Sequence, residues 1–164
     1  MNMKKLKIPL QIFFSALICC ILCACQTDTG SPELIDCETA AELFKHQLVP
    51  CTENDFQGYS LGWVSNGQNG EVIYTNVNYH FSDGWIQIRD QSRGGGDIDF
   101  LLMDTDSVVY NGKTFYTKDA SLEGYTAVTY FPNGETGLYY GACFPSDMEL
   151  SEVFDLVLSL QIPD

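Results

Sequence analysis

The segment Asn78–Arg89, NYHFSDGWIQIR, predicts a β-hairpin and indicates the fold class of the chain. Polar and apolar residues alternate on both sides of Asp83-Gly84, and this pair suits a two-residue type I′ turn because both turn positions need positive φ. Such a turn would set apolar side chains opposite one another on one face and polar ones on the other, in the pairs Phe81–Ile86, Tyr79–Ile88, His80–Gln87 and Asn78–Arg89. A slip by one residue would mix the two faces. We therefore expect a half-buried antiparallel pair.

Further turns and strands follow the same pattern. Asn111-Gly112 separates Ser107–Tyr110 from Lys113–Thr117, and Asn133-Gly134 separates Tyr125–Phe131 from Thr136–Phe144. Together with the first hairpin, these turns predict an antiparallel meander. Apolar alternation predicts two more strands, one that begins with Tyr59, Leu61 and Trp63 and one, after the glycine-rich connection 93–97, with Ile98, Phe100 and Leu102.

One helix is predicted at each end of the domain. Apolar residues recur at helical spacing before Pro50, which should end the first helix, and the set is Cys37, Ala40, Ala41, Phe44 and Leu48. The capping-box pattern Ser146-Asp147-Met148-Glu149 should open the second helix, whose apolar stripe is Leu150, Val153, Phe154, Val157 and Leu158. The sequence thus predicts an α+β fold: a curved antiparallel β-sheet of six to seven strands with an N-terminal and a C-terminal helix packed on one face.

The first residues have the pattern of a secretory signal. Three lysines precede an apolar run from Ile8 to Leu22, and Leu22-Cys23-Ala24-Cys25 resembles the lipobox of bacterial lipoproteins. The resemblance implies cleavage before Cys25 and a diacylglyceryl thioether on that residue, because two acyl chains suffice for stable anchoring. An uncleaved signal anchor is the alternative, although Pro9 and Gln11 weaken a membrane span.

The lipobox divides the chain into three parts. Residues 1–24 are the expected signal peptide, residues 25–32 a lipidated flexible tether, and residues 33–164 a single α+β domain. We expect the domain to lie on the extracytoplasmic face of the cell membrane, which it contacts through the lipid on Cys25.

Charge limits the partners of the chain. There are 8 Lys and Arg against 22 Asp and Glu, which gives a net charge of −14, and removal of the signal would remove lysines but no acid. A nucleic-acid surface needs clustered Lys or Arg, so no nucleic acid is expected, and anionic lipids or wall polymers should be repelled. Solubility explains such a charge, and recognition of a basic partner is the alternative.

The cysteines and histidines give no metal site. Cys37, Cys51 and Cys143 permit one disulfide outside the cytoplasm, and all three pairings stay open. They form no CxxC motif, and neither His46 nor His80 stands at a zinc-like spacing from them. We expect no metal and no cofactor.

The sequence offers few residues for catalysis. Only two histidines are available as a base for a nucleophile, and turn chemistry explains why Ser82 and Asp83 follow His80. The segment Asp104–Ser107 matches only a fragment of a calcium-binding loop. We therefore predict that the protein is not an enzyme.

A binding face is predicted on the polar side of the first hairpin. Strand alternation places amides, a cation and an aromatic plane there, from Tyr74, Asn76, Asn78, His80, Trp85, Gln87 and Arg89. Such a set suits an extended peptide or a sugar, with Trp85 as a stacking surface and Arg89 as a donor. A solvated sheet face is the alternative.

The order of these features resembles that of the domain of unknown function 4367. The matching segments are the helix ETAAELF leading to Val49-Pro50, then Gly58–Leu61, Val109–Lys113 and Leu138–Gly141 before the closing helix. Members of that family occur in secreted lipoproteins and in the external parts of anti-sigma-factor-like membrane proteins. The resemblance implies an envelope-facing domain, and it carries over no catalytic residue.

The sequence therefore predicts a lipid-anchored, extracytoplasmic, non-catalytic binding or sensing module that recognises an envelope protein, a peptide or a cell-wall fragment. The alternative is a carrier of an apolar small molecule or lipid, in a pocket between sheet and helices lined by Tyr59, Trp63, Tyr79, Phe81, Phe100 and Phe115. A hydrolase would need a cleft that joins a base to a nucleophile.

Overall fold

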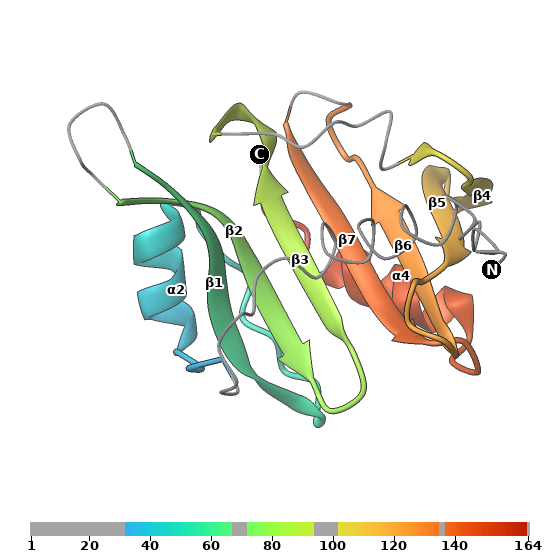
Figure 1. The fold of residues 1–164 in the computed structure, drawn as a ribbon, viewed down its shortest axis with the longest axis horizontal. Coiled ribbons are helices and arrows are strands. Elements are labelled where there is room, and N and C mark those ends of the chain that lie inside the picture. The colour runs from blue at the N-terminus through green and yellow to red at the C-terminus, as the bar shows by residue number, and fades with distance from the viewer. Residues whose placement is uncertain (1–31, 67–71, 94–101, 135–136, 164) are drawn as a thin grey trace, which may run out of the picture. The chain divides into compact units, whose positions relative to one another are not determined.

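The computed structural model describes residues 32–66, 72–93, 102–134 and 137–163, and Pro32–Asp164 forms a compact unit of its own. The described residues form one antiparallel seven-stranded sheet and two α-helices, so the predicted α+β class is confirmed (Figure 1). The elements are α2 (Cys37–Phe44), β1 (Phe56–Asn66), β2 (Val72–Phe81), β3 (Trp85–Asp90), the 3-10 turn η1 (Gln91–Arg93), β4 (Asp106–Tyr110), β5 (Lys113–Asp119), β6 (Tyr125–Tyr130), β7 (Leu138–Pro145) and α4 (Leu150–Ser159).

Two meanders share the sheet, and they meet where β3 pairs with β7. The strand order is β1-β2-β3-β7-β6-β5-β4, so the last strand in the sequence lies in the centre (Figure 1). The β3–β7 pairing aligns Ile86 with Ala142, Gln87 with Gly141 and Ile88 with Tyr140. Every residue pair in a ladder shares a face, so this register continues both the apolar and the polar face across the sheet.

The core lies between one face of the sheet and the two helices. Phe115 shows how it is packed, because its ring stacks on Tyr130 at 4.8 Å and on Phe154 of α4 at 4.3 Å between centroids. Burial of each such side chain contributes roughly 1.5–3 kcal/mol. The stripe predicted on the last helix is confirmed, since Val153, Phe154 and Val157 are buried. On α2, Ala40 and Phe44 are buried in the same cluster.

Most of the rings considered as the lining of a ligand pocket belong to this core. Tyr59, Tyr79, Phe81 and Phe115 are all buried. The Tyr59 and Tyr79 rings meet edge to face at 4.7 Å, and the Phe81 ring lies 5.5 Å from that of Phe144. Rings in mutual contact fill space as core residues do. The side chain of Trp63 and all of Phe100 lie outside the described part.

The first hairpin exists, but its predicted turn and register are wrong. Its residue pairs include His80–Trp85, Tyr79–Ile86 and Asn78–Gln87, which is a shift of two positions from the expected pairing. The connection is wider than a two-residue turn: the Phe81 amide donates to the Gly84 carbonyl at 2.9 Å, and neither Asp83 nor Gly84 has positive φ. The Ser82 amide donates to the Asp55 carbonyl at 3.1 Å, and this bond holds the loop against the segment before β1. Because the shift is even, both faces keep the predicted residues.

The other two turns differ from one another. Asn111 and Gly112 have φ of 49° and 74° and Tyr110 pairs with Lys113, so the predicted two-residue turn is confirmed. At the third turn Tyr130 pairs with Tyr140, so the loop that contains Asn133-Gly134 is longer than two residues. Of the expected strand with Ile98, Phe100 and Leu102, only Leu102 is described, and it lies outside any strand.

The predicted end of the first helix is wrong. The helix ends at Phe44 because Lys45 adopts a left-handed conformation, with φ of 57°, well before Pro50. The Arg93 guanidinium donates to the Phe44 carbonyl at 2.6 Å, which satisfies one of the carbonyl groups that a helix end leaves open.

The predicted start of the last helix is wrong as well. α4 begins at Leu150 after Glu149, whose side chain makes no capping bond, and Met148 closes a turn onto the Pro145 carbonyl. The Ser146 hydroxyl, which the capping box would have used, instead accepts a hydrogen bond from Thr126 at 3.0 Å. Tertiary contacts with β6 therefore displace the helix start.

Gly84 is required by space, and this gives a test of the hairpin end. A Cβ at this position would meet the Phe144 ring and lie 2.6 Å from the Cys143 carbonyl oxygen. We predict that Gly84→Ala lowers the free energy of unfolding by about 1–3 kcal/mol, as overpacking does. Urea denaturation measures it. The control is Gly141→Ala, whose Cβ would lie 3.7 Å from the Tyr139 ring. Equal losses in both variants would contradict the proposed clash.

Candidate functional site

The residues predicted to bind a ligand share the sheet face that is opposite the helices, named here the open face. The β2–β3 register pairs Asn78 with Gln87 and His80 with Trp85 on this face, and it pairs Asn76 with Arg89. Tyr74, which pairs with Val64, follows on the same side of β2 by alternation. The structure therefore brings the predicted set together.

Hydrogen bonds connect the polar side chains of the open face into a continuous row. The polar row consists of Ser60, Asn78, Gln87 and Tyr139, on four neighbouring strands. The Asn78 side-chain amide donates to the Ser60 hydroxyl at 3.3 Å, and that of Gln87 donates to Asn78 Oδ1 at 2.9 Å. The Tyr139 hydroxyl donates to Gln87 Oε1 at 3.5 Å. Asn76 adds a second bond to Asn78 at 3.3 Å. The amide groups of the half-buried Asn78 and Gln87 are therefore held in fixed orientations, while Ser60 and Tyr139 are buried.

His80 extends the row at one end. Its Nε2 lies 2.7 Å from the Ser60 hydroxyl oxygen. Burial lowers the pKa of His80 below its ordinary value of 6.5, because desolvation disfavours the imidazolium. At neutral pH this side chain therefore offers a neutral ring with one donor and one acceptor rather than a positive charge.

Aromatic rings continue the open face beyond the polar row. The Tyr139 ring lies 5.8 Å from that of Phe131, which lies 6.2 Å from that of Tyr116, and we name these three residues the aromatic row. Burial raises the pKa of Tyr139, against a smaller lowering by Arg89, so its phenol stays neutral. Sequence reasoning missed these rings because they reach the hairpin only through the non-local pairing of β3 with β7.

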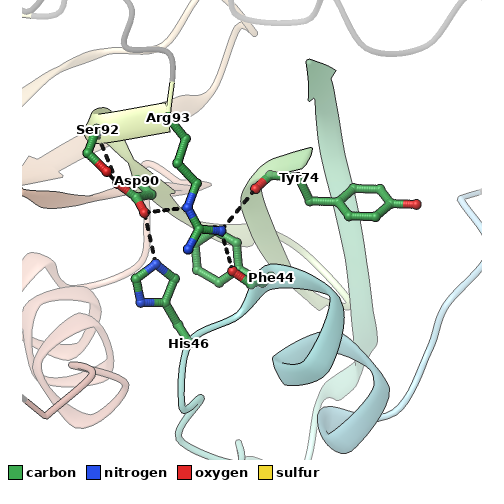
Figure 2. Close-up of polar contacts among 6 residues, drawn as sticks. All are labelled: Phe44, His46, Tyr74, Asp90, Ser92 and Arg93. Atoms are coloured by element: carbon green, nitrogen blue, oxygen red, sulfur yellow. Dashed lines mark hydrogen bonds and ion pairs between the residues drawn. The ribbon is translucent and has the colours of Figure 1, made fainter. Parts of the chain in front are cut away.

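A charged cluster fixes the end of β3, on the face that meets the helices (Figure 2). Asp90 follows Ile86 and Ile88 on the core side and is 6% exposed. Its carboxylate accepts from His46 at 2.9 Å, from Arg93 at 2.8 Å and from the Ser92 hydroxyl at 2.6 Å. Figure 2 shows that these groups converge on one carboxylate. We name Asp90, His46, Ser92 and Arg93 the Asp90 cluster.

The Asp90 cluster connects three elements. Arg93 donates to the Phe44 carbonyl at the end of α2 and, at 3.5 Å, to the Tyr74 carbonyl of β2. Its guanidinium also lies 5.7 Å from the centroid of the Phe44 ring. Burial raises the pKa of Asp90, but hydrogen bonds from Ser92 and His46 and the charge of Arg93 outweigh it and hold the pKa below its ordinary value. Asp90 is therefore ionised at neutral pH.

The same geometry separates this cluster from a catalytic triad. A triad needs a nucleophile bonded to a base that a third group orients. Here the Ser92 hydroxyl donates to Asp90 directly, and His46 bonds the other carboxylate oxygen. The serine is therefore held by the acid rather than activated by the histidine.

The described residues hold no cluster of three His, Cys, Asp or Glu side chains that would bind a metal ion. No disulfide joins Cys37, Cys51 and Cys143 in the described part of the chain. The amide of Cys51 donates to the Tyr59 hydroxyl at 3.1 Å. Burial of Tyr59 raises the pKa of this phenol above its ordinary range.

A comparison with family models, curated proteins and solved structures finds no match for this chain. The resemblance to the domain of unknown function 4367 therefore stays a prediction. The lipobox and Cys25 lie outside the described residues. Among the residues that are described, no helix is long and apolar enough to cross a membrane.

The Asp90 cluster predicts a pH-dependent contribution to stability. We expect Asp90→Asn to lower the free energy of unfolding at neutral pH by roughly 1.5–3 kcal/mol, the range for hydrogen bonds to charged groups. A carboxyl whose pKa is lowered by folding stabilises the protein above its unfolded pKa, near 3.8, and this contribution is lost as the pH falls through the folded pKa. The gap between wild type and variant should therefore be constant above about pH 5 and narrow as the pH falls below about 4.

Urea unfolding across that pH range measures the gap. The matched control is Asp106→Asn, because Asp106 is exposed on the edge strand β4. A gap for Asp90→Asn that stays constant with pH would refute the role assigned to its charge.

Proposed function

We propose that this protein is a lipid-anchored, extracytoplasmic and non-catalytic binding module, which binds a neutral glycan strand of the cell wall on its open face. The observation that carries the proposal is the polar row lying directly beside the aromatic row. The two rows share Tyr139, whose hydroxyl bonds Gln87 and whose ring contacts that of Phe131.

The chemistry of the two rows suits a sugar. Amides and a neutral imidazole both donate and accept hydrogen bonds, which matches the hydroxyl and acetamido groups of a glycan. The half-buried rings of Tyr116 and Phe131 offer flat apolar surface, and tyrosine also carries a hydroxyl group. An extended peptide would instead bind along a strand edge, where main-chain groups are open. The open face therefore favours the glycan over the peptide.

Fixed side chains support binding at modest energetic cost. Asn78 and Gln87 are held by hydrogen bonds to neighbouring strands before any ligand arrives. Ordering a side chain on binding costs about 0.5–1.5 kcal/mol, and this cost is reduced where the side chain is already held. A net charge of −14 also supports a neutral ligand, since anionic wall polymers would be repelled.

The glycan proposal predicts a loss of binding when side chains of the open face are removed. We expect a Trp85→Ala, Gln87→Ala variant to bind isolated cell-wall glycan, stripped of anionic polymers, about tenfold more weakly, since one lost hydrogen bond and one lost ring contact together remove roughly 1–2 kcal/mol. Co-sedimentation of residues 26–164 with the glycan measures it.

The control for this experiment is Val109→Ser, on the edge strand β4, where Val109 is 74% exposed. It should bind as wild type does. Unchanged binding by the double variant, with an unchanged unfolding midpoint, would refute the open face as the site. Wild-type protein that stays in the supernatant would refute the glycan itself.

The proposed lipid anchor on Cys25 predicts that the protein changes cell fraction when this residue is replaced. We expect Cys25→Ser to abolish incorporation of labelled palmitate and to move the protein out of the membrane fraction, because it removes the residue that would carry the acyl chains. Metabolic labelling and fractionation measure both. Cys20→Ser is the control and should behave as wild type. A Cys25→Ser protein that stays in the membrane fraction would support the uncleaved signal anchor instead.

A further inference from the structure

A groove with an apolar floor lies on the helix side of the sheet, at the end where the β2–β3 loop and α4 meet. Its volume is about 680 Å³. The floor comes from the end of β7, the turn after it and one face of α4, through Phe144, Pro145, Met148 and Leu156. A volume in this range accommodates a small ligand or a few residues of a peptide.

The rim of this groove is acidic on all of its elements. Carboxylates come from the segment before β1, from the β2–β3 loop, from the turn after β7 and from α4, and they are Glu53, Asp55, Asp83, Asp147, Glu152 and Asp155. The described residues of this lining include no Lys, Arg or His. We name this feature the acidic groove.

Within the described part of the chain, the ion pairs leave these carboxylates without a basic partner. Two ion pairs in this part join His46 and Arg93 to Asp90, at the end of β3. Asp155 accepts a hydrogen bond from Tyr110 at 2.9 Å, and Asp83 accepts one from Ser82 at 3.4 Å, but neither donor carries a charge. Like charges that face a shared space repel one another, so the acidic groove is a place where a bound cation lowers the energy.

We propose that the acidic groove is a docking site for a basic peptide segment, which places an apolar side chain on the floor and its Lys or Arg side chains against the rim. Charge complementarity selects the partner. The described carboxylates do not gather in any group of three that would hold a metal ion, so they are suited to several separate cations rather than to one. The apolar floor favours a peptide with apolar residues between its charges over a small polyamine.

This proposal is independent of the open face, which lies on the other side of the sheet. The test uses the chain from Gln26 onward, which contains the whole compact unit Pro32–Asp164. The probe is a dye-labelled peptide of alternating lysine and leucine, and fluorescence anisotropy measures its dissociation constant at low and at physiological salt. Two control peptides are compared with it. In one, glutamate replaces every lysine, and in the other, serine replaces every leucine.

The groove variant is Glu53→Gln, Asp55→Asn, Glu152→Gln, and it should weaken binding of the lysine–leucine peptide about tenfold, as expected for the loss of three exposed ion pairs. The matched control removes three exposed acids elsewhere, by Glu33→Gln, Glu42→Gln, Asp106→Asn, and should change binding less than about twofold. Met148→Gln tests the apolar floor. It should weaken binding of the lysine–leucine peptide and leave binding of the lysine–serine peptide unchanged.

Three results would overturn the proposal. Equal weakening by the groove variant and the control would mean that net charge alone attracts the peptide. Equal binding of the glutamate or serine peptides would remove the selectivity that the rim and the floor should give. An absence of measurable binding at low salt, by a protein whose thermal unfolding is normal, would exclude this partner.

Discussion

The antiparallel pairing of β3 with β7 is the contact on which the rest of the structure depends. It joins a meander of β1, β2 and β3 to a meander of β4 to β7, so that their apolar faces form one core. The register Ile88–Tyr140 continues the core across the junction, and Arg89–Tyr139 continues the open face. A slip by one residue would expose Ile86 and Ile88 and bury Gln87 and Arg89, so the hydrophobic pattern of β3 fixes this register.

The Asp90 cluster reinforces the same junction from the end of β3. A charge that is 6% exposed destabilises a protein unless hydrogen bonds and opposite charges surround it, and Asp90 receives both. Through Arg93 the carboxylate also caps α2 and reaches the backbone of β2, so the position of the N-terminal helix depends on the end of β3. The strand that carries Gln87 and Arg89 on the open face is therefore held from the helix side.

Local patterns predicted the elements of this fold well, and tertiary contacts explain the misses. Alternation assigned the residues of the first hairpin to the right faces even though the turn was wrong, because an error of two positions preserves the faces. Gly84 looked like a turn glycine, but its small size serves the close approach of Phe144, a residue far away in sequence. The capping box failed for a similar reason, since the Ser146 hydroxyl bonds Thr126.

The two candidate surfaces satisfy their polar groups differently, and this difference follows from the topology. On the open face, strands lie side by side, so amides on adjacent strands reach one another and form the polar row. A ligand on the open face must form hydrogen bonds with groups that already have partners. Its binding should therefore depend more on shape and on ring contacts than on charge. At the acidic groove, loops and a helix from distant parts of the sequence meet, and the described residues that line it with these carboxylates include no basic one. Their repulsion is relieved only by solvent ions or a cationic partner, so binding at the groove should weaken with salt, and binding at the open face should be nearly independent of it.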